Sequence, residues 1–406
     1  MSKWVVVVGV DWGKYKHWVD EGVGKPYQVL QTPTDILRWI AELRARYPEG
    51  RIGVAVEQHR GALIHALMEY DFIDLLPLNP AQTGAYRQAV RPSGGKDDPT
   101  DATMIRIFAE KHQDQLEVWQ PHDARTRELA YLTEWRRKLV DQNTGLLQQV
   151  DDALMQYFPQ ARELAGEAGS PMWCAFLKEW PTLDAVLQAR ATTLQKFYRK
   201  HGSRSSKLIE SRLALVASAV PVTRDAAVIN SRAAIVEALV TLIATLVKEI
   251  GKLQGRIAGL WQSHPDRAIF ESLPGAGECL APRLAVVLGS DRDRWDAKSL
   301  QTFSGVAPII IASGKSRTVA ARFRCPKFLR QTFHEFALHS IGHSEWARRF
   351  YDHQRARGKS QHTALRALAF RWIRIIVACW KSATPYCEAR YLASLAHRGS
   401  PSAKIA

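Results

Sequence analysis

The chain has few of the residues that mark zinc-binding or secreted proteins. Its 406 residues include only five cysteines, which show no CxxC spacing and have no histidine pair nearby, so a zinc site is not expected. The odd count and wide spacing are typical of reduced thiols. No signal peptide precedes the first apolar run, and no apolar stretch is long enough to span a membrane. These absences predict a cytoplasmic protein with no membrane partner.

Glycine-rich nucleotide-binding loops are also missing. No GxGxxG follows the first apolar run, which argues against a Rossmann domain. The segment Gly314-Lys315-Ser316 lacks the upstream glycine spacing of a Walker A loop. Neither common route to a bound nucleotide is therefore indicated.

Charge, in contrast, is abundant and unevenly distributed. The net charge is +16, which is typical of proteins that bind a polyanion, although a merely basic enzyme remains an alternative. Residues 1–110 carry 13 Lys and Arg against 14 Asp and Glu, whereas residues 311–374 carry 14 against 3. Acidic chemistry is therefore expected near the N-terminus and phosphate binding toward the C-terminus.

Four acids stand at positions that can hold metal ions. Asp11 ends the apolar run from Val5 to Val10, and Glu57 ends a second run from Ile52 to Val56. Asp98 and Asp101 open a helical pattern at an i, i+3 spacing, which places both on one face. Strand ends are where open α/β sheets place their chemistry, so the four can converge. Converging carboxylates need cations, which predicts a pair of Mg²⁺ ions.

Each acid also has a simpler interpretation. A strand-end aspartate is often a turn residue, and Asp98 before Pro99 could be a helix N-cap. Asp101 could be an ordinary first-turn acid, and Asp97 is expected to project from a different face. The joint pattern favours the metal site.

The order of elements predicts the fold. Strands near 5–10, 17–19 and 27–30 are followed by a helix capped by Thr34 and then by alternating strands and helices, which matches a ribonuclease H-like α/β domain. Residues 123–157 and 235–260 carry long apolar stripes, interpreted either as an intra- or intermolecular coiled coil or as ordinary core helices. Short helices are expected over 160–225, a mainly helical unit from about 270, and a disordered tail.

Two segments suggest contact with DNA. The turn Leu273–Gly277 resembles a helix–hairpin–helix motif, in which glycines let backbone N–H groups approach a phosphate. Further along, an apolar run delivers Ser313 into a turn with Lys315 and Arg317, where a hydroxyl could attack a phosphodiester beside cations. A plain polar turn is the alternative. The residues expected to contact nucleic acid are Gly275, Gly277, Lys315, Arg317, Arg322, Arg324 and Lys327.

Taken together, these motifs resemble the insertion-sequence 110 family of transposases, the bridge-RNA-guided DEDD serine recombinases. The resemblance extends to about residue 390 and rests on a series of motifs in order. They are Gly9-Val10-Asp11, Val56-Glu57, Leu78-Asn79-Pro80, Lys96-x-Asp98-x-x-Asp101, Tyr157-Phe158-Pro159, Leu273–Gly277 and Phe303–Pro308 leading to Ser313-Gly314. The chain departs from the family at Asp97, at Lys315–Thr318 and in extra length over 160–225.

The resemblance implies a bacterial, nucleoid-associated recombinase of a mobile element. It implies a RuvC-like catalytic domain over 1–122, a helical coiled-coil linker over 123–265, and a mainly α transposase domain over 266–395, with 396–406 as the tail. Asp11, Glu57, Asp98 and Asp101 would be catalytic and bind Mg²⁺, and Ser313 would form a phosphoserine link to DNA. Target and donor double-stranded DNA, a structured non-coding bridge RNA and a tetrameric dimer of dimers are the implied partners.

Three alternatives remain open from the residues. Ser316, rather than Ser313, could be the nucleophile. The acids alone could form a RuvC-like, metal-dependent nuclease that cuts junctions by water attack without a covalent intermediate. The chain could also be a catalytically silent scaffold that binds RNA or DNA.

Overall fold

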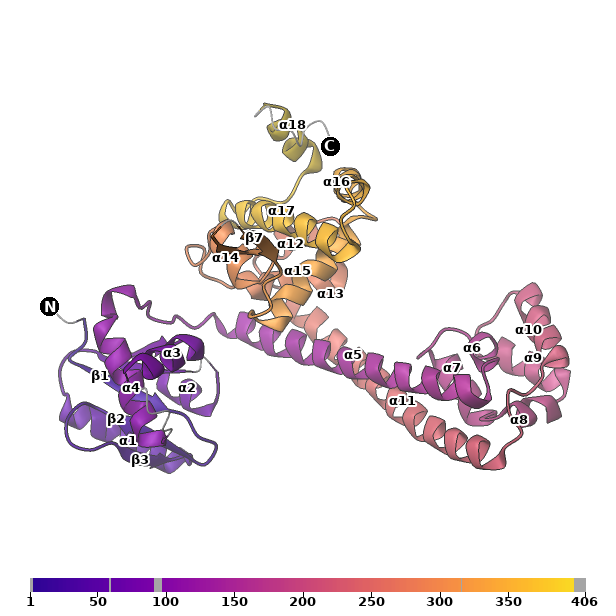
Figure 1. Ribbon diagram of the computed structural model, residues 1–406, viewed down its shortest axis with the longest axis horizontal. Coiled ribbons are helices and arrows are strands. Elements are labelled where there is room, and N and C mark those ends of the chain that lie inside the picture. The colour runs from indigo at the N-terminus through magenta and orange to yellow at the C-terminus, as the bar shows by residue number, and fades with distance from the viewer. Residues whose placement is uncertain (1–2, 58–59, 91–96, 315, 398–406) are drawn as a thin grey trace. The chain divides into compact units, whose positions relative to one another are not determined.

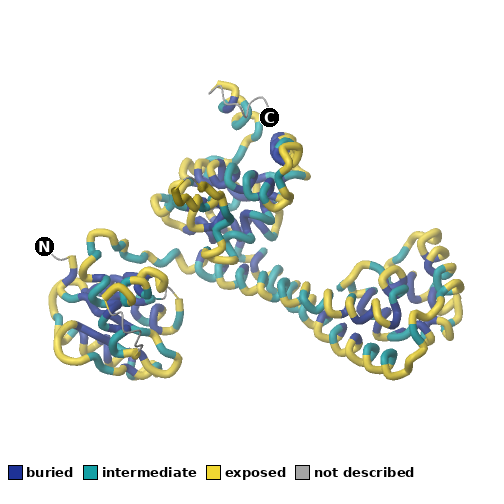
Figure 2. The backbone as a smooth tube through the Cα atoms, viewed as in Figure 1, coloured by how far each residue is buried: buried dark blue, intermediate teal, exposed yellow. Residues whose placement is uncertain are grey.

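The chain folds into two compact units. The computed structural model describes residues 3–57, 60–90, 97–314 and 316–397. The first unit ends at Pro121 and the second begins at His122. Each unit buries its own apolar clusters, drawn as dark blue segments in Figure 2. Among the described residues, no helix is both long enough and apolar enough to cross a membrane.

A five-stranded mixed sheet forms the centre of the first unit, with the spatial order β3-β2-β1-β4-β5. Its strands are β1 (Val6–Asp11), β2 (Lys16–Asp20), β3 (Tyr27–Leu30), β4 (Ile52–Val56) and β5 (Ile73–Pro77). β1 pairs antiparallel with β2 and parallel with β4, so a meander precedes the parallel strands. This is the ribonuclease H-like arrangement that the sequence predicts, with the first strand in the middle.

In the described part of the first unit, four α-helices accompany this sheet. They are α1 (Pro33–Arg46), α2 (Ala62–Leu67), α3 (Pro80–Val90) and α4 (Asp98–Lys111). The N-cap of α1 is Thr32 and not Thr34 as the sequence suggested, because Pro33 takes the first helical position that suits its fixed φ. α4 lies directly against β1, since a Cβ at Gly9 would come 2.2 Å from the backbone oxygen of Ala102. Gly9 therefore allows the close approach that brings α4 to the central strand.

Two long helices run through the second unit (Figure 1). α5 (Ala124–Tyr157) and α11 (Ala226–Gln262) pack on each other in opposite directions. Arg256 near the end of α11 forms a 2.5 Å ion pair with Glu128 near the start of α5. The apolar stripes that the sequence left open as intra- or intermolecular are thus paired within one chain.

Short helices fill the chain between the two long ones. They are α6 (Ala161–Leu164), α7 (Pro171–Glu179), α8 (Leu183–Gln188), α9 (Ala191–Lys200) and α10 (Ser206–Ser218). Their aromatic core includes the fully buried Phe176 and Tyr198, which cluster with Val240 of α11. This segment has a hydrophobic core separate from the one that follows.

The remaining elements include the helices whose core contains the fully buried Trp372 and the mostly exposed β6–β7 hairpin. They are α12 (Arg267–Glu271), α13 (Gly277–Leu288), α14 (Ala297–Phe303), β6 (Ile309–Ser313), β7 (Ser316–Ala320), α15 (Lys327–Ser340), α16 (Glu345–Ala356), α17 (Gln361–Lys381) and α18 (Glu388–His397). Leu129 of α5 and Ile257 of α11 belong to the same core, so residues 123–265 and 266–395 lie in one compact unit.

The end of the chain differs from the expected tail over 396–406. α18 continues to His397, and residues 398–406 lie outside the described part of the chain. The helix has a packing reason: Tyr391 lies 5.0 Å, ring centroid to ring centroid, from Trp346, and Leu395 is buried.

Candidate active site

Two of the four acids lie side by side at one edge of the sheet. Asp11 is the last residue of β1 and Glu57 directly follows β4. Val10 and Val56 are register partners in the parallel β1–β4 pair, so the next residue on each strand reaches the same edge. Both acids are half-buried. The strand-end placement predicted from the sequence is therefore what the fold produces.

The other two acids come from the first turn of α4. Asp98 is its first residue and is exposed, whereas the side chain of Asp101, one turn later, is only 12% exposed. Asp97 is the N-cap residue and its side chain makes no capping hydrogen bond. The interpretation of Asp98 as the cap is thus not what the structure shows.

Helix α3 brings two side chains to these acids that the sequence analysis missed. The hydroxyl of Thr83 donates a hydrogen bond to Glu57 Oε1. One turn later, Arg87 Nη1 lies 2.5 Å from Asp101 Oδ1. The i, i+4 spacing of Thr83 and Arg87 was readable in the sequence, but such pairs occur on many helices and carry no signal of their own.

Arg87 has the electrostatic environment of a cation surrounded by carboxylates. Its pKa is raised, first by the hydrogen bond and charge of Asp101 and then by the charges of Glu57 and Asp11. Three of the four acids from two strands and one helix therefore act on one guanidinium. The fold directs Asp11, Glu57 and Asp101 to a common region.

The acids suit Mg²⁺ in kind and in their placement on the fold. Carboxylate oxygens are the ligands that this hard cation prefers. They are not closed around one point, however: among the described residues, no group of three or more His, Cys, Asp or Glu side chains is close enough together to hold an ion. Arg87 offers the physical reason, since its guanidinium bonds to Asp101.

Ser313 lies at the tip of a β-hairpin in the second unit. It is the last residue of β6, and its register partner is Ser316, the first residue of β7. Both serines are exposed, and Gly314 in the turn has a φ of +55°. Residues directly opposite one another on a hairpin project from the same face, so both hydroxyls are presented together. The predicted contact Lys315 lies outside the described residues, and Arg317 is exposed on β7.

The two glycines of the helix–hairpin–helix resemblance have different surroundings. A Cβ at Gly275, whose φ is +79°, would lie 2.8 Å from the backbone oxygen of His339, so this glycine has a packing reason. Gly277 is the first residue of α13 and is exposed, and a Cβ added there would meet no atom within 4 Å. Only Gly277 leaves room for a phosphate at this helix N-terminus.

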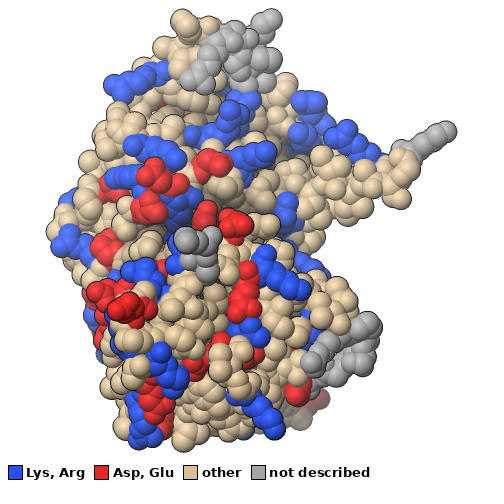
Figure 3. Space-filling view, turned by 90° about the vertical axis from the view of Figure 1, so that its left-hand side faces the viewer, with Lys and Arg blue, Asp and Glu red and all other residues tan. Residues whose placement is uncertain are grey.

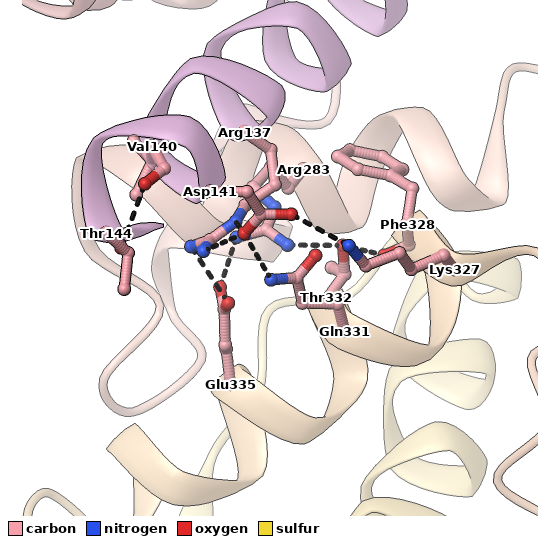
Figure 4. Close-up of polar contacts among 10 residues, drawn as sticks. All are labelled: Arg137, Val140, Asp141, Thr144, Arg283, Lys327, Phe328, Gln331, Thr332 and Glu335. Carbon is pink, nitrogen blue, oxygen red and sulfur yellow. Dashed lines mark hydrogen bonds and ion pairs between the residues drawn. The ribbon is translucent and has the colours of Figure 1, made fainter. Parts of the chain in front are cut away.

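The predicted basic contacts also differ in their surroundings. Arg324 is exposed, and Arg322 is half-buried. Lys327 Nζ lies 3.1 Å from Asp141 on α5, and Figure 4 shows the network around that carboxylate. Burial opposes ionisation of Asp141, but hydrogen bonds from Arg137, Lys327 and Gln331 outweigh it and lower the pKa to about 2. Lys327 is thus already engaged by an acid.

The same network joins α5 to the helices of the C-terminal core. Arg137 Nη1 lies 3.0 Å from Glu335 Oε1, and Glu335 also accepts a hydrogen bond from Arg283. The side chain of Arg283 is only 4% exposed. These partners are far apart in the chain, and only the Arg137–Asp141 spacing on one helix was readable in advance. On the face of the molecule drawn in Figure 3, Lys and Arg side chains lie interspersed with Asp and Glu side chains.

Comparison with known proteins identifies two related domains, one before and one after α11. Residues 8–159 match a family described as transposase, and residues 267–352 match the transposase IS116/IS110/IS902 family. The first match includes all four acids and the second includes Ser313.

Curated relatives extend this likeness over nearly the whole chain. The proposed mini-circle transposase for IS117 of Streptomyces coelicolor is 24% identical, with 96% of this chain and 97% of that protein aligned. The 42 kDa protein of insertion element IS900 of Mycobacterium paratuberculosis is 26% identical, with 94% and 97% aligned. The 43.6 kDa protein of insertion element IS110 of Streptomyces coelicolor is 25% identical over 73% of each chain.

Proposed function

Because the chain belongs to the IS110 family of transposases, which cut and rejoin DNA, we propose that it recombines DNA through a covalent phosphoserine intermediate under the guidance of a structured non-coding RNA. The observation that carries the proposal is the pairing of two features. Acids gather at a sheet edge of the first unit, and an exposed serine stands at a hairpin tip of the second.

In the proposed reaction, Ser313 is the nucleophile. Its hydroxyl loses a proton as Oγ forms a bond to the phosphorus of a DNA phosphodiester. A P–O bond of the strand breaks at the same time, and the departing strand oxygen takes up a proton. Attack by a strand hydroxyl on the phosphoserine reverses these bonds and rejoins DNA. Arg317, exposed on β7 next to Ser316 in the chain, would neutralise charge on the phosphate.

The acids supply the other half of the proposed site. Asp11, Glu57, Asp98 and Asp101 would hold a pair of Mg²⁺ ions, which supply positive charge beside the scissile phosphate when bound. Thr83 fixes the carboxylate of Glu57 by its hydrogen bond. The acids and Ser313 lie in different units, so we propose that they meet in a homo-oligomer, a tetramer assembled on target and donor DNA.

Trapping of the intermediate tests this function. Wild-type protein incubated with DNA carrying its element ends is expected to give a protein–DNA adduct that survives denaturation and is lost in Ser313→Ala. Ser316→Ala is the matched control, because Ser316 is the register partner of Ser313 on the same hairpin. An adduct that persists in Ser313→Ala contradicts the proposal. An adduct that is lost only in Ser316→Ala would assign the nucleophile to Ser316.

Two further outcomes separate the alternatives. Cleavage without any adduct, abolished by Asp11→Asn, indicates a RuvC-like nuclease that uses water. Recombination that survives Asp11→Ala indicates a scaffold whose acids are not catalytic. Sequencing of the RNA that co-purifies with the chain tests the guide: one abundant structured species with segments complementary to target and donor DNA is expected.

A further inference from the structure

A cavity of about 1430 Å³ opens in the second unit beside the hairpin that carries Ser313. Its walls come from α16, α17, α18 and from β7 through Val319 and Ala320. α17 contributes one continuous face, with Thr363, Phe370 and Arg374 among its lining residues. The cavity exceeds the roughly 300–1,000 Å³ typical of drug-sized ligands, so it has room for an extended ligand.

The lining of this cavity is strongly cationic. Lys359, Arg366, Arg371, Arg374 and Arg390 contribute to it, and no Asp or Glu does so among the described residues. Elsewhere in the chain arginines are commonly neutralised, as Arg87 is by Asp101. A cavity whose described lining residues supply five cations and no carboxylate is electrostatically suited to an anion.

Several of these cations have no acidic partner among the described residues. Lys359, Arg366, Arg374 and Arg390 form no ion pair with any residue in the described part of the chain. Arg374 and Arg390 are also exposed. The positive charge of this region also acts on His334. Its pKa is lowered to about 4, chiefly by burial and then by the charge of Arg366. Phosphate groups would supply the missing negative charge.

Between the cations, the walls are apolar and aromatic. Phe370 and Tyr391 are half-buried at the lining, and Val319 of the hairpin is 65% exposed. Flat rings beside unpaired arginines are the combination that proteins use to bind single-stranded nucleic acid, in which bases stack on aromatic faces while cations follow the backbone. In a duplex the bases are already stacked on one another, so such a lining favours unpaired nucleotides.

We propose that this cavity binds unpaired nucleotides of a DNA strand, with bases against Phe370 and Tyr391 and phosphates at Arg366, Arg374 and Arg390. The inference rests on the proposed function in one respect, that DNA strands are opened while they are exchanged. Because Val319 and Ala320 of β7 form part of the wall, a strand held here lies beside the hairpin of Ser313.

Binding of oligonucleotides to the full chain tests the proposal. The double variant Arg374→Ala/Arg390→Ala is expected to bind a fluorescent single-stranded oligo(dT) about tenfold more weakly. Its affinity should also fall less steeply with salt, by about 0.7 in the logarithmic slope for each phosphate that is no longer neutralised. Phe370→Leu, which keeps an apolar side chain but removes the ring, is expected to weaken binding about tenfold as well. Affinity for a duplex of equal length is expected to stay unchanged in both variants.

A charge-matched control separates the cavity from the general positive field. Arg204 and Arg224 are also exposed and form no ion pair with a described residue, so Arg204→Ala/Arg224→Ala removes the same net charge elsewhere. Equal losses of affinity in the two double variants, no loss in either, or an equal loss for duplex would each overturn the proposal. Tighter binding of oligo(U) than of oligo(dT), abolished in the cavity variants, would assign the cavity to RNA instead.

The outcome is independent of the catalytic serine. Ser313→Ala is expected to leave oligo(dT) affinity unchanged while it abolishes the covalent adduct. The adduct assay therefore tests the role of Ser313, and the oligonucleotide-binding assay tests the cavity. A negative result in one assay does not decide the other.

Discussion

Arg87 is the cation around which the acids of the first unit are arranged. It lies 2.5 Å from Asp101 and is also within the electrostatic reach of Glu57 and Asp11. A guanidinium in this place does what a metal ion would do, because it offsets repulsion among carboxylates. An ion that binds these acids must then compete with Arg87 for Asp101. This competition explains why, among the described residues, the acids share a region without forming a closed ligand set.

The competition predicts that Arg87→Gln strengthens divalent-ion binding. Removing the guanidinium frees Asp101 and eliminates one positive charge beside the site, so we expect Mn²⁺, used as a probe for Mg²⁺, to bind about tenfold more tightly. Titration of the full chain with Mn²⁺, followed by electron paramagnetic resonance of the free ion, measures this without any reaction.

Arg38→Gln provides the matched control for this measurement. Arg38 also pairs with an aspartate, Asp35, at 3.1 Å on a helix of the same unit, but its side chain is 62% exposed and this partner is none of the four candidate acids. We expect this variant to bind Mn²⁺ like the wild type and Asp101→Asn to bind it more weakly. Weaker or unchanged binding in Arg87→Gln would show that Arg87 does not compete with the ion.

Two histidines of the second unit predict a pH dependence of stability. Burial first, and then Arg366 and Arg330, lower the pKa of His334 to about 4, and burial and Arg294 lower that of His122 similarly. The unfolded chain, with a histidine pKa near 6.5, therefore binds more protons than the folded one between about pH 6.5 and about pH 4. The free energy of unfolding should fall as pH falls through this window.

Urea unfolding of wild-type protein and His334→Gln from about pH 7 to about pH 4 checks this prediction. His334→Gln is expected to flatten the pH dependence in part, while His122 keeps the remainder. The charged groups that act on His334 are Arg330 of α15 and Arg366 and His362 of α17. The substitution leaves these three groups, and the repulsion among them, unchanged. A pH dependence that is identical in the two proteins would mean that His334 titrates normally.

At the scale of elements, the sequence predicted strands and helices correctly where the local pattern of apolar residues determines the element. The β-branched runs that end at Asp11 and Glu57 are buried strands because both faces of the central sheet are covered. Long apolar stripes likewise specified α5 and α11. The roles of α3 could not be read, because Thr83 and Arg87 act on acids from β4 and α4, and such contacts depend on tertiary packing. The partner of the stripe in α5 was unreadable for the same reason.

The ion pairs that join α15 to α13 and α5 are expected to contribute measurably to stability. Arg283 is almost fully buried and pairs with Glu335, which Arg137 also contacts. Glu335→Gln would leave a buried guanidinium without its carboxylate, and we expect it to lower the free energy of unfolding of the second unit by about 3 kcal/mol. Urea unfolding followed by tryptophan fluorescence measures the change.

An exposed pair between helices serves as the comparison. Glu128 pairs with Arg256, but their side chains are 39% and 65% exposed. Glu128→Gln is therefore expected to cost less than about 1 kcal/mol. Similar losses of stability in Glu128→Gln and Glu335→Gln would indicate that burial of Arg283 does not set the strength of its pair.

For the whole molecule, the separation of charge coincides with the division into units. Residues 1–110 are close to neutral, and the residues that carry the excess of Lys and Arg, 311–374, belong to the second unit. The sequence could reveal this asymmetry because charge needs only counting. It could not reveal which acid meets which serine, because that depends on how units and protomers assemble. An experiment on mixed protomers addresses this directly.

Mixing two inactive variants is expected to restore adduct formation. The Asp11→Asn protein lacks one of the four acids but retains Ser313. The Ser313→Ala protein retains all four acids but lacks the proposed nucleophile. If the acids of one protomer serve the serine of another, co-assembled protein contains some complete sites and forms adducts on the Asp11→Asn protomer alone. Distinguishing the protomers by a size tag shows on an electrophoresis gel which of them carries the DNA. If every site is built within one chain, each protomer lacks half of its site and the mixture stays as inactive as its parts.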